Sequence, residues 1–211
     1  AQEGEQVVDV MDAMGVEKAW VASHGSGGVV LTWLALHQPD RLKGLIYEAT
    51  TGGVQVQTNS PHPAPPTPGA VSFAEMTLRL LANPTREAVR QRLLPAMHPD
   101  HPERITEELV DVRLAHYRRP STSEAMARYY SSRAEFAASE EEIANIQLPV
   151  LVLANDSRGE LSLVGPRRLA EVIPHAQFKI LEGTGQWGHW EAAEEFNETV
   201  ASFVLGDSRR H

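Results

Sequence analysis

The sequence of 211 residues contains no cysteine, which excludes a disulfide framework and a metal site built from thiolates. It also lacks an apolar run of about 18 residues and a signal-peptide pattern, so a cytoplasmic location is the default expectation. Positive charge is scarce, because 19 Lys and Arg stand against 28 Asp and Glu, a net charge of -9. This balance argues against nucleic acid or an anionic membrane as a partner.

Motifs for metals and phosphates are missing as well. The histidines that show no helical pairing with carboxylates are His98, His101, His116 and His175. Gly27 and Gly28 are not followed by the Lys that a phosphate-binding loop needs. We therefore expect neither a metal nor a cofactor. Hydrophobic residues make up 42% of the chain, which is enough to build the core of one globular domain.

The most informative stretch that is present is the run SHGSGG at residues 23–28. Residues 18–22, just before it, are a short apolar run with β-branched and aromatic members, which predicts a buried strand. Residues 29–38, just after it, are mostly apolar and long enough for a helix, which Pro39 ends. Strand, Gly-rich turn and helix form the context of a nucleophile elbow, the turn that presents the serine of a G-x-S-x-G motif.

Two frames of this turn compete. If Ser26 is at the apex, the motif is close to G-x-S-x-G, but His24 replaces its first Gly. If Gly25 is at the apex, the attacking hydroxyl is missing. The first frame predicts a nucleophile and the second predicts none.

Further segments extend the pattern along the chain. They are residues 34–42 (LALHQPDRL), 83–120, 148–153 (LPVLVL), 185–191 (GQWGHWE) and 194–197 (EEFN). With these segments the chain resembles the α/β-hydrolase superfamily, and within it the meta-cleavage-product hydrolases, which split carbon–carbon bonds in dienoates. The resemblance implies an α/β fold, a partial α/β-hydrolase fold in which a mostly parallel sheet is flanked by helices. It further implies a first core segment at residues 1–52, an inserted helical lid at 53–147 and a second core segment at 148–211.

The same resemblance decides between the two frames. In the family, the Pro-Asp-Arg of residues 39–41 follows the nucleophile at a fixed distance, which implies that Gly25 is the apex. It also puts Arg158 at the position of the catalytic acid and Gln186 at the position of the catalytic base. Arginine is permanently cationic and cannot stabilise an imidazolium, and an amide has no basic nitrogen. The resemblance therefore implies that the catalytic triad is lost.

Replacements for the triad stand nearby in the sequence. Ser26 follows the apex, His189 lies three residues beyond Gln186, and Asp156 precedes Arg158 by two. A rebuilt Ser26–His189–Asp156 set is one hypothesis. The alternative is that Ser26 faces the backbone, His189 packs in a loop and Asp156 is solvated. A nucleophile and its base must meet at about 3 Å, and we favour the alternative because all three groups would have to move together.

Part of a ligand site is nonetheless kept. By the resemblance, Arg113 matches a lid arginine that holds the dienoate carboxylate, and the guanidinium fork suits a carboxylate. Trp187 matches the tryptophan after the catalytic histidine, and His24 a polar residue beside the nucleophile. With Ser26, these residues are the predicted ligand contacts. A solvated helix face for Arg113 and core packing for Trp187 and His24 are the alternatives.

The sheet is predicted to have an open edge. Strands are expected near residues 18–23, 42–47, 149–154 and 177–181, and in the family's sheet order they are neighbours. Only an amphipathic helix at residues 6–14 precedes the first of them, and an uncovered strand edge invites pairing. Either the chain is a fragment, or a second copy or another chain covers that edge. Elsewhere we predict N-caps at Thr85 and Thr106 and a helix over residues 166–173.

Three functions are compatible with these features. The first is a degenerate hydrolase that binds a small acidic or aromatic ligand or performs cyclisation, isomerisation or elimination. The second is an active ester or carbon–carbon bond hydrolase with the relocated Ser26 set. The third is a structural subunit that partners another chain. The lost triad and the retained Arg113 and Trp187 favour the first, although a fold alone does not establish chemistry.

Overall fold

The computed structural model describes residues 2–55, 73–131 and 138–207. The chain divides into two compact units, one formed by residues 1–57 and 136–211 and the other by residues 58–135. The first unit holds the sheet and will be called the core unit. The second will be called the helical unit.

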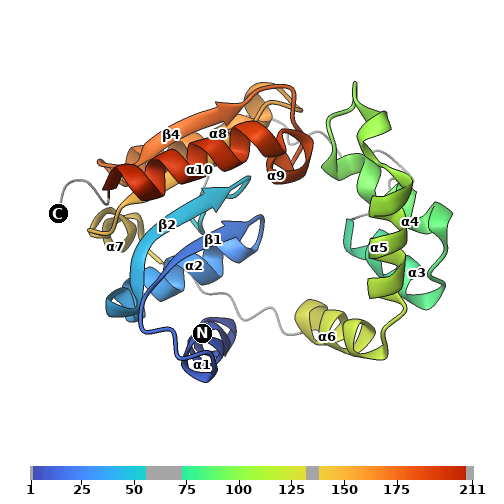
Figure 1. Ribbon diagram of the computed structural model, residues 1–211, viewed down its shortest axis with the longest axis horizontal. Coiled ribbons are helices and arrows are strands. Elements are labelled where there is room, and N and C mark those ends of the chain that lie inside the picture. The colour runs from blue at the N-terminus through green and yellow to red at the C-terminus, as the bar shows by residue number, and fades with distance from the viewer. Residues whose placement is uncertain (1, 56–72, 132–137, 208–211) are drawn as a thin grey trace. The chain divides into compact units, whose positions relative to one another are not determined.

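The core unit is built on a parallel sheet of four strands in the order β1-β2-β3-β4 (Figure 1). The strands are β1 (Ala19–His24), β2 (Leu42–Glu48), β3 (Val150–Asn155) and β4 (Gln177–Leu181). Position, order and direction agree with the prediction, so the α/β fold with a parallel sheet is confirmed. In a parallel sheet all strands end at the same side, and the loops that follow them gather there.

Helices cover both faces of this sheet. They are α1 (Gln2–Ala13), α2 (Gly27–His37), α7 (Glu140–Ala144), α8 (Glu160–Val172), α9 (Gly188–Glu191) and α10 (Ala193–Asp207), with a 3-10 turn at Pro39–Arg41. One apolar cluster joins the sheet to α2 and α8, and a second joins it to α10 through Phe203. The middle strands β2 and β3 are therefore almost wholly buried, which explains their continuous apolar sequence.

Helix α8 begins earlier than predicted. The expected helix started at Pro166, but the observed one starts at Glu160 and carries Pro166 in its interior. Proline normally disfavours such a position because it removes an amide donor. Here Leu163, Gly165 and Pro166 are all buried, and Gly165 lies so close to Thr51 that a Cβ would clash with it. Tertiary packing therefore overrides the local signal.

The helical unit contains α3 (Phe73–Ala82), α4 (Arg86–Leu93), α5 (Glu107–Tyr117) and α6 (Pro120–Ser131), with 3-10 turns at Leu94–Ala96 and Pro102–Arg104. Both predicted N-caps are confirmed: Thr85 Oγ1 accepts from the amide of Ala88, and Thr106 Oγ1 accepts from that of Leu109, each at 3.2 Å. The role of residues 53–147 as a lid stays a prediction.

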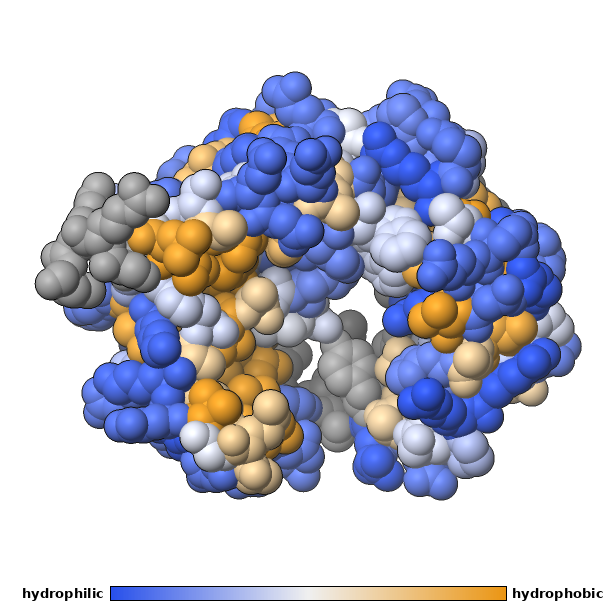
Figure 2. Space-filling view, in the orientation of Figure 1, coloured by the Kyte–Doolittle hydropathy of each residue, from blue (hydrophilic) through white to orange (hydrophobic). Residues whose placement is uncertain are grey.

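Strand β1 forms one edge of the described sheet, since it pairs with β2 alone among the described residues. Apolar surface lies close by, because Val10 and Met14 are 57% and 72% exposed. Figure 2 shows orange areas in the region of α1 and β1. A second copy or another chain over this edge stays a prediction. Within the described ranges, no helix is both long and apolar enough to cross a membrane.

Candidate functional site

The loop after β1 has the geometry of a nucleophile elbow. Gly25 has φ of 55°, a left-handed conformation that favours glycine, and its amide donates to the Glu48 carbonyl oxygen at 3.1 Å. Ser26 is already helical at φ -63° and ψ -20° and starts α2. A Cβ placed on Gly25 would meet nothing within 4 Å. The apex of the elbow thus has room for a side chain that the sequence does not supply.

A cavity of about 550 Å³ opens beside this elbow and will be called the elbow cavity. Its lining comes from the ends of the strands and from α8: Gly25, Ser26, Val29, Ala49, Thr50, Thr51, Asn155, Ser157, Arg158, Leu161, Ser162, Gly165, Pro166 and Gln186. Three segments distant in sequence therefore bring Gly25, Arg158 and Gln186 to one cavity. These are the positions at which the sequence predicted the degenerate triad.

Arg158 is the cationic side chain of the elbow cavity. It lies in the turn after β3, where its backbone amide donates to Ser162 Oγ at 2.9 Å and its side chain is exposed. Among the described residues, no carboxylate forms an ion pair with its guanidinium. Asp156, two residues earlier, has a buried Oδ1 that accepts no hydrogen bond from the described part of the chain.

His189 forms a close pair with Glu48, the last residue of β2. The Nδ1 atom of His189 lies 2.8 Å from Glu48 Oε2, and the His189 amide donates to Glu48 Oε1 at 2.8 Å. The Glu48 side chain is 8% exposed, whereas the His189 side chain is 41% exposed. In the hypothesis of a relocated triad, Asp156 was the partner of His189. The structure gives that place to Glu48 instead.

Aromatic rings surround His189. The ring centroids of His24 and Trp187 lie 5.5 Å and 5.8 Å from that of His189, and Phe196 is 6.1 Å away. His24 Nε2 is 2.8 Å from the Gln186 carbonyl oxygen, which links this cluster to the elbow cavity. Burial lowers the pKa of His24 below its usual value, although Glu48 and the bond to Gln186 oppose the shift. His24 is therefore neutral near pH 7.

Glu48 is the residue of the candidate site that the sequence interpretation missed. The signal was a charged residue directly after the apolar run of β2, at the side of the sheet where the elbow stands. Such a carboxylate must find donors once it is buried. Its donors come from α9, more than 140 residues later, and no short motif announces that contact.

The comparisons with known proteins identify the family. Residues 3–199 match the model described as "Alpha/beta hydrolase family". The chain belongs to the alpha/beta hydrolase family. It is similar to several hydrolases.

One similar protein is the 2-hydroxy-6-oxononadienedioate/2-hydroxy-6-oxononatrienedioate hydrolase of Paraburkholderia phymatum, 26% identical over 92% of this chain and 65% of that enzyme. A Caulobacter relative whose name proposes carbamate hydrolysis is 30% identical over 97% of this chain and 72% of that protein. The meta-cleavage product hydrolase of Pseudomonas fluorescens IP01 has a TM-score of 0.77 and 20% identity, over 97% of this chain and 71% of that one. The chain thus spans about two thirds of the length of its curated relatives.

Arg113 belongs to the helical unit of this hydrolase-family chain. Its Nη2 donates to the Tyr117 hydroxyl at 2.7 Å, and its guanidinium lies over the Tyr117 ring, 5.0 Å from the centroid. Its predicted contact with a ligand carboxylate stays a prediction.

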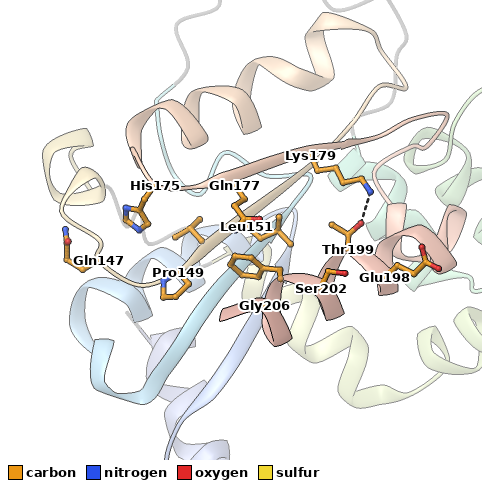
Figure 3. A pocket seen from close by; sticks show the side chains of 12 residues that line it. Gln147, Pro149, Leu151, His175, Gln177, Lys179, Glu198, Thr199, Ser202 and Gly206 are labelled. Atoms are coloured by element: carbon orange, nitrogen blue, oxygen red, sulfur yellow. Dashed lines mark hydrogen bonds between the residues drawn. The ribbon is translucent and has the colours of Figure 1, made fainter. Parts of the chain in front are cut away.

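A second cavity, of about 660 Å³, lies at the opposite ends of the strands (Figure 3). Pro149 and Gln177 mark the amino-terminal ends of β3 and β4 there, and Phe203 of α10 lies across from them. Lys179 donates to Thr199 Oγ1 at 2.8 Å, so its charge is already engaged. Open α/β sheets bind ligands beyond the carboxyl ends of their strands. The elbow cavity is therefore the candidate functional site of this alpha/beta hydrolase.

Proposed function

We propose that this alpha/beta hydrolase-fold protein binds a small carboxylate or aromatic ligand in the elbow cavity without a serine nucleophile at the apex. The observation that carries the proposal is the wall of that cavity, where Gly25, Arg158 and Gln186 meet. None of these side chains is a nucleophile, a general base or an acid that could orient one. Chemistry without a nucleophile, such as isomerisation, elimination or cyclisation, remains open to such a site.

The charge of the elbow cavity supports a carboxylate ligand. Arg158 offers a planar fork of donors that suits two carboxylate oxygens. This cationic side chain favours an anionic ligand in a protein whose net charge is otherwise -9. The dienedioates named for the Paraburkholderia relative belong to this chemical class.

Two measurements test the proposal. A fluorophosphonate probe should leave the protein unlabelled, as followed by mass spectrometry. Benzoate should raise the melting temperature, and at 100 times its Kd the stabilisation would be about 2.7 kcal/mol. Arg158→Gln should abolish the shift. Arg167→Gln is the matched control, because Arg167 is also an exposed arginine but pairs with Glu160 and does not line the elbow cavity. An equal benzoate shift in both variants would contradict the proposal.

Serine hydrolysis at Ser26 is the second candidate. The observation in its favour is that Ser26 lines the elbow cavity and that its hydroxyl caps no amide of α2. It predicts fluorophosphonate labelling on Ser26 that is lost in Ser26→Ala. Labelling of this kind would replace the first proposal, since it would identify a nucleophile one residue after the apex.

A further inference from the structure

His189 and Glu48 do not line the elbow cavity, so the proposed binding of a ligand at Arg158 does not explain their pairing. A carboxylate that is only 6% exposed is costly to bury unless charged or polar donors surround it. Both oxygens of Glu48 face His189, one at its Nδ1 and one shared by Nδ1 and the amide. Besides the bond from the His189 amide, which fixes the start of α9, the contacts of Glu48 with the ring orient the imidazole.

The contacts also define which nitrogen of the ring can act. An ionised carboxylate only accepts hydrogen bonds, so the proton of neutral His189 resides on Nδ1 and points at Glu48. The lone pair then belongs to Nε2, on a ring that is 41% exposed. A buried carboxylate, an imidazole fixed in one tautomer and a side chain that is partly exposed are the parts of a general base.

We propose that His189, oriented by Glu48, activates water for the hydrolysis of small aromatic esters beside the elbow. Nε2 takes a proton from water as the oxygen adds to the ester carbonyl carbon. The carbon–oxygen bond to the alcohol then breaks, and the imidazolium returns the proton to the leaving oxygen. Trp187 and Phe196, near the His189 ring, provide the apolar surface that favours an aromatic substrate. This activity goes beyond the proposed binding function and requires neither Ser26 nor a ligand on Arg158.

The test uses p-nitrophenyl acetate and the full chain. His189→Gln should lower kcat/KM by about 100-fold. Glu48→Gln should lower it by about 10- to 100-fold, because the ring loses its orientation. His175→Gln is the matched control, since His175 is an exposed histidine whose Nε2 lies 2.8 Å from the Leu148 carbonyl oxygen. It should leave the rate unchanged, which separates catalysis from the background of exposed imidazoles.

Two further readouts separate a general base from a structural role. The reaction should be slower in D2O, and mass spectrometry should find no acyl group on the protein.

Several results would overturn this inference. They are a His189→Gln or Glu48→Gln rate equal to that of the parent, or a covalent acyl intermediate. Thermal melts of each variant verify folding, and if Glu48→Gln does not fold, His189→Gln and the isotope effect still decide. The benzoate shift is measured without turnover, so a missing shift would contradict the binding proposal and leave the hydrolysis result intact.

Discussion

At the scale of single residues, Gly25 combines the backbone conformation of an elbow with the absence of a side chain. Gly25 adopts φ of 55°, and an added Cβ would find open space. The conformation that normally presents a nucleophile is therefore preserved at a residue that has none. The chemistry available at position 25 therefore depends on a side chain that the fold does not require.

Gly25→Ser tests this separation of backbone and chemistry. We expect the variant to fold with a loss of about 1–2 kcal/mol in the free energy of unfolding, because a side chain at positive φ is strained. It should remain unlabelled by a fluorophosphonate, since Gln186 supplies no base. Urea unfolding and mass spectrometry measure the two effects.

The double variant Gly25→Ser with Gln186→His is the matched comparison. It places a base at the cavity wall and should gain labelling at position 25. Strong labelling of Gly25→Ser alone would contradict the expectation and would show that His24 or His189 already reaches the apex.

At the residue scale, some residues of the site could be predicted from the sequence, and one could be found only in the structure. The family resemblance implied the positions of Gly25, Arg158 and Gln186, and the structure gathers all three at the elbow cavity. Glu48 could not be predicted, because its role depends on a contact with His189 across 141 positions. The role of a buried charged side chain depends on its partner, and the fold determines which residue that partner is.

At the scale of elements, a buried hydroxyl pair joins α2 to β2. Thr32 Oγ1 donates to the Gly52 carbonyl oxygen at 2.6 Å, so its proton is committed there. The Tyr47 hydroxyl, 3.1 Å from Thr32 Oγ1, must then be the donor between them. Both side chains are fully buried. The pair thus holds α2 against the centre of the sheet. It thereby also helps to position the elbow, which directly precedes α2.

Thr32→Val should destabilise the protein by about 1–3 kcal/mol, because it leaves two buried polar groups without partners. Tyr47→Phe should cost less, since Thr32 keeps its bond to Gly52. Urea denaturation of the two variants provides the comparison. A larger loss in Tyr47→Phe would contradict this assignment of donor and acceptor.

The same pair predicts a dependence on alkaline pH. Burial raises the pKa of Tyr47 to about 12 from its ordinary value of 10.0. The neutral form is favoured in the folded state, so its contribution to stability is complete below pH 10 and is lost as pH rises toward 12. Ultraviolet titration should show one tyrosine ionising after the others, and Tyr47→Phe should remove that last step. A titration without a late step would contradict the prediction.

Elements differed in how well the sequence predicted them. The strands followed from short apolar runs and turn residues, which are local signals, whereas their order followed from the family resemblance. The start of α8 did not follow from local signals, because Pro166 suggested a boundary that packing of Gly165 against Thr51 overrides. The periodicity of a segment indicates the secondary structure that it prefers in isolation. Packing against neighbouring elements determines where the helix or strand begins and ends.

At the scale of the whole molecule, the open edge of β1 has a measurable consequence. Among the described residues, β2 alone pairs with β1, and free backbone groups at an edge favour association. We expect native mass spectrometry to show a species heavier than the 23.2 kDa chain. Dilution should restore the monomer if the contact is between copies. A monomer at all concentrations would contradict the expectation.

Glu48 also connects the elbow after β1 to the start of α9. Its carbonyl oxygen holds the elbow amide of Gly25, and its carboxylate holds His189. Displacement of either segment is therefore felt by the other, and such coupling is reciprocal in equilibrium binding. Benzoate binding should consequently slow hydrogen exchange at the His189 amide, which mass spectrometry would detect and which Glu48→Gln would abolish. The end of one buried strand would then transmit binding at the elbow to α9.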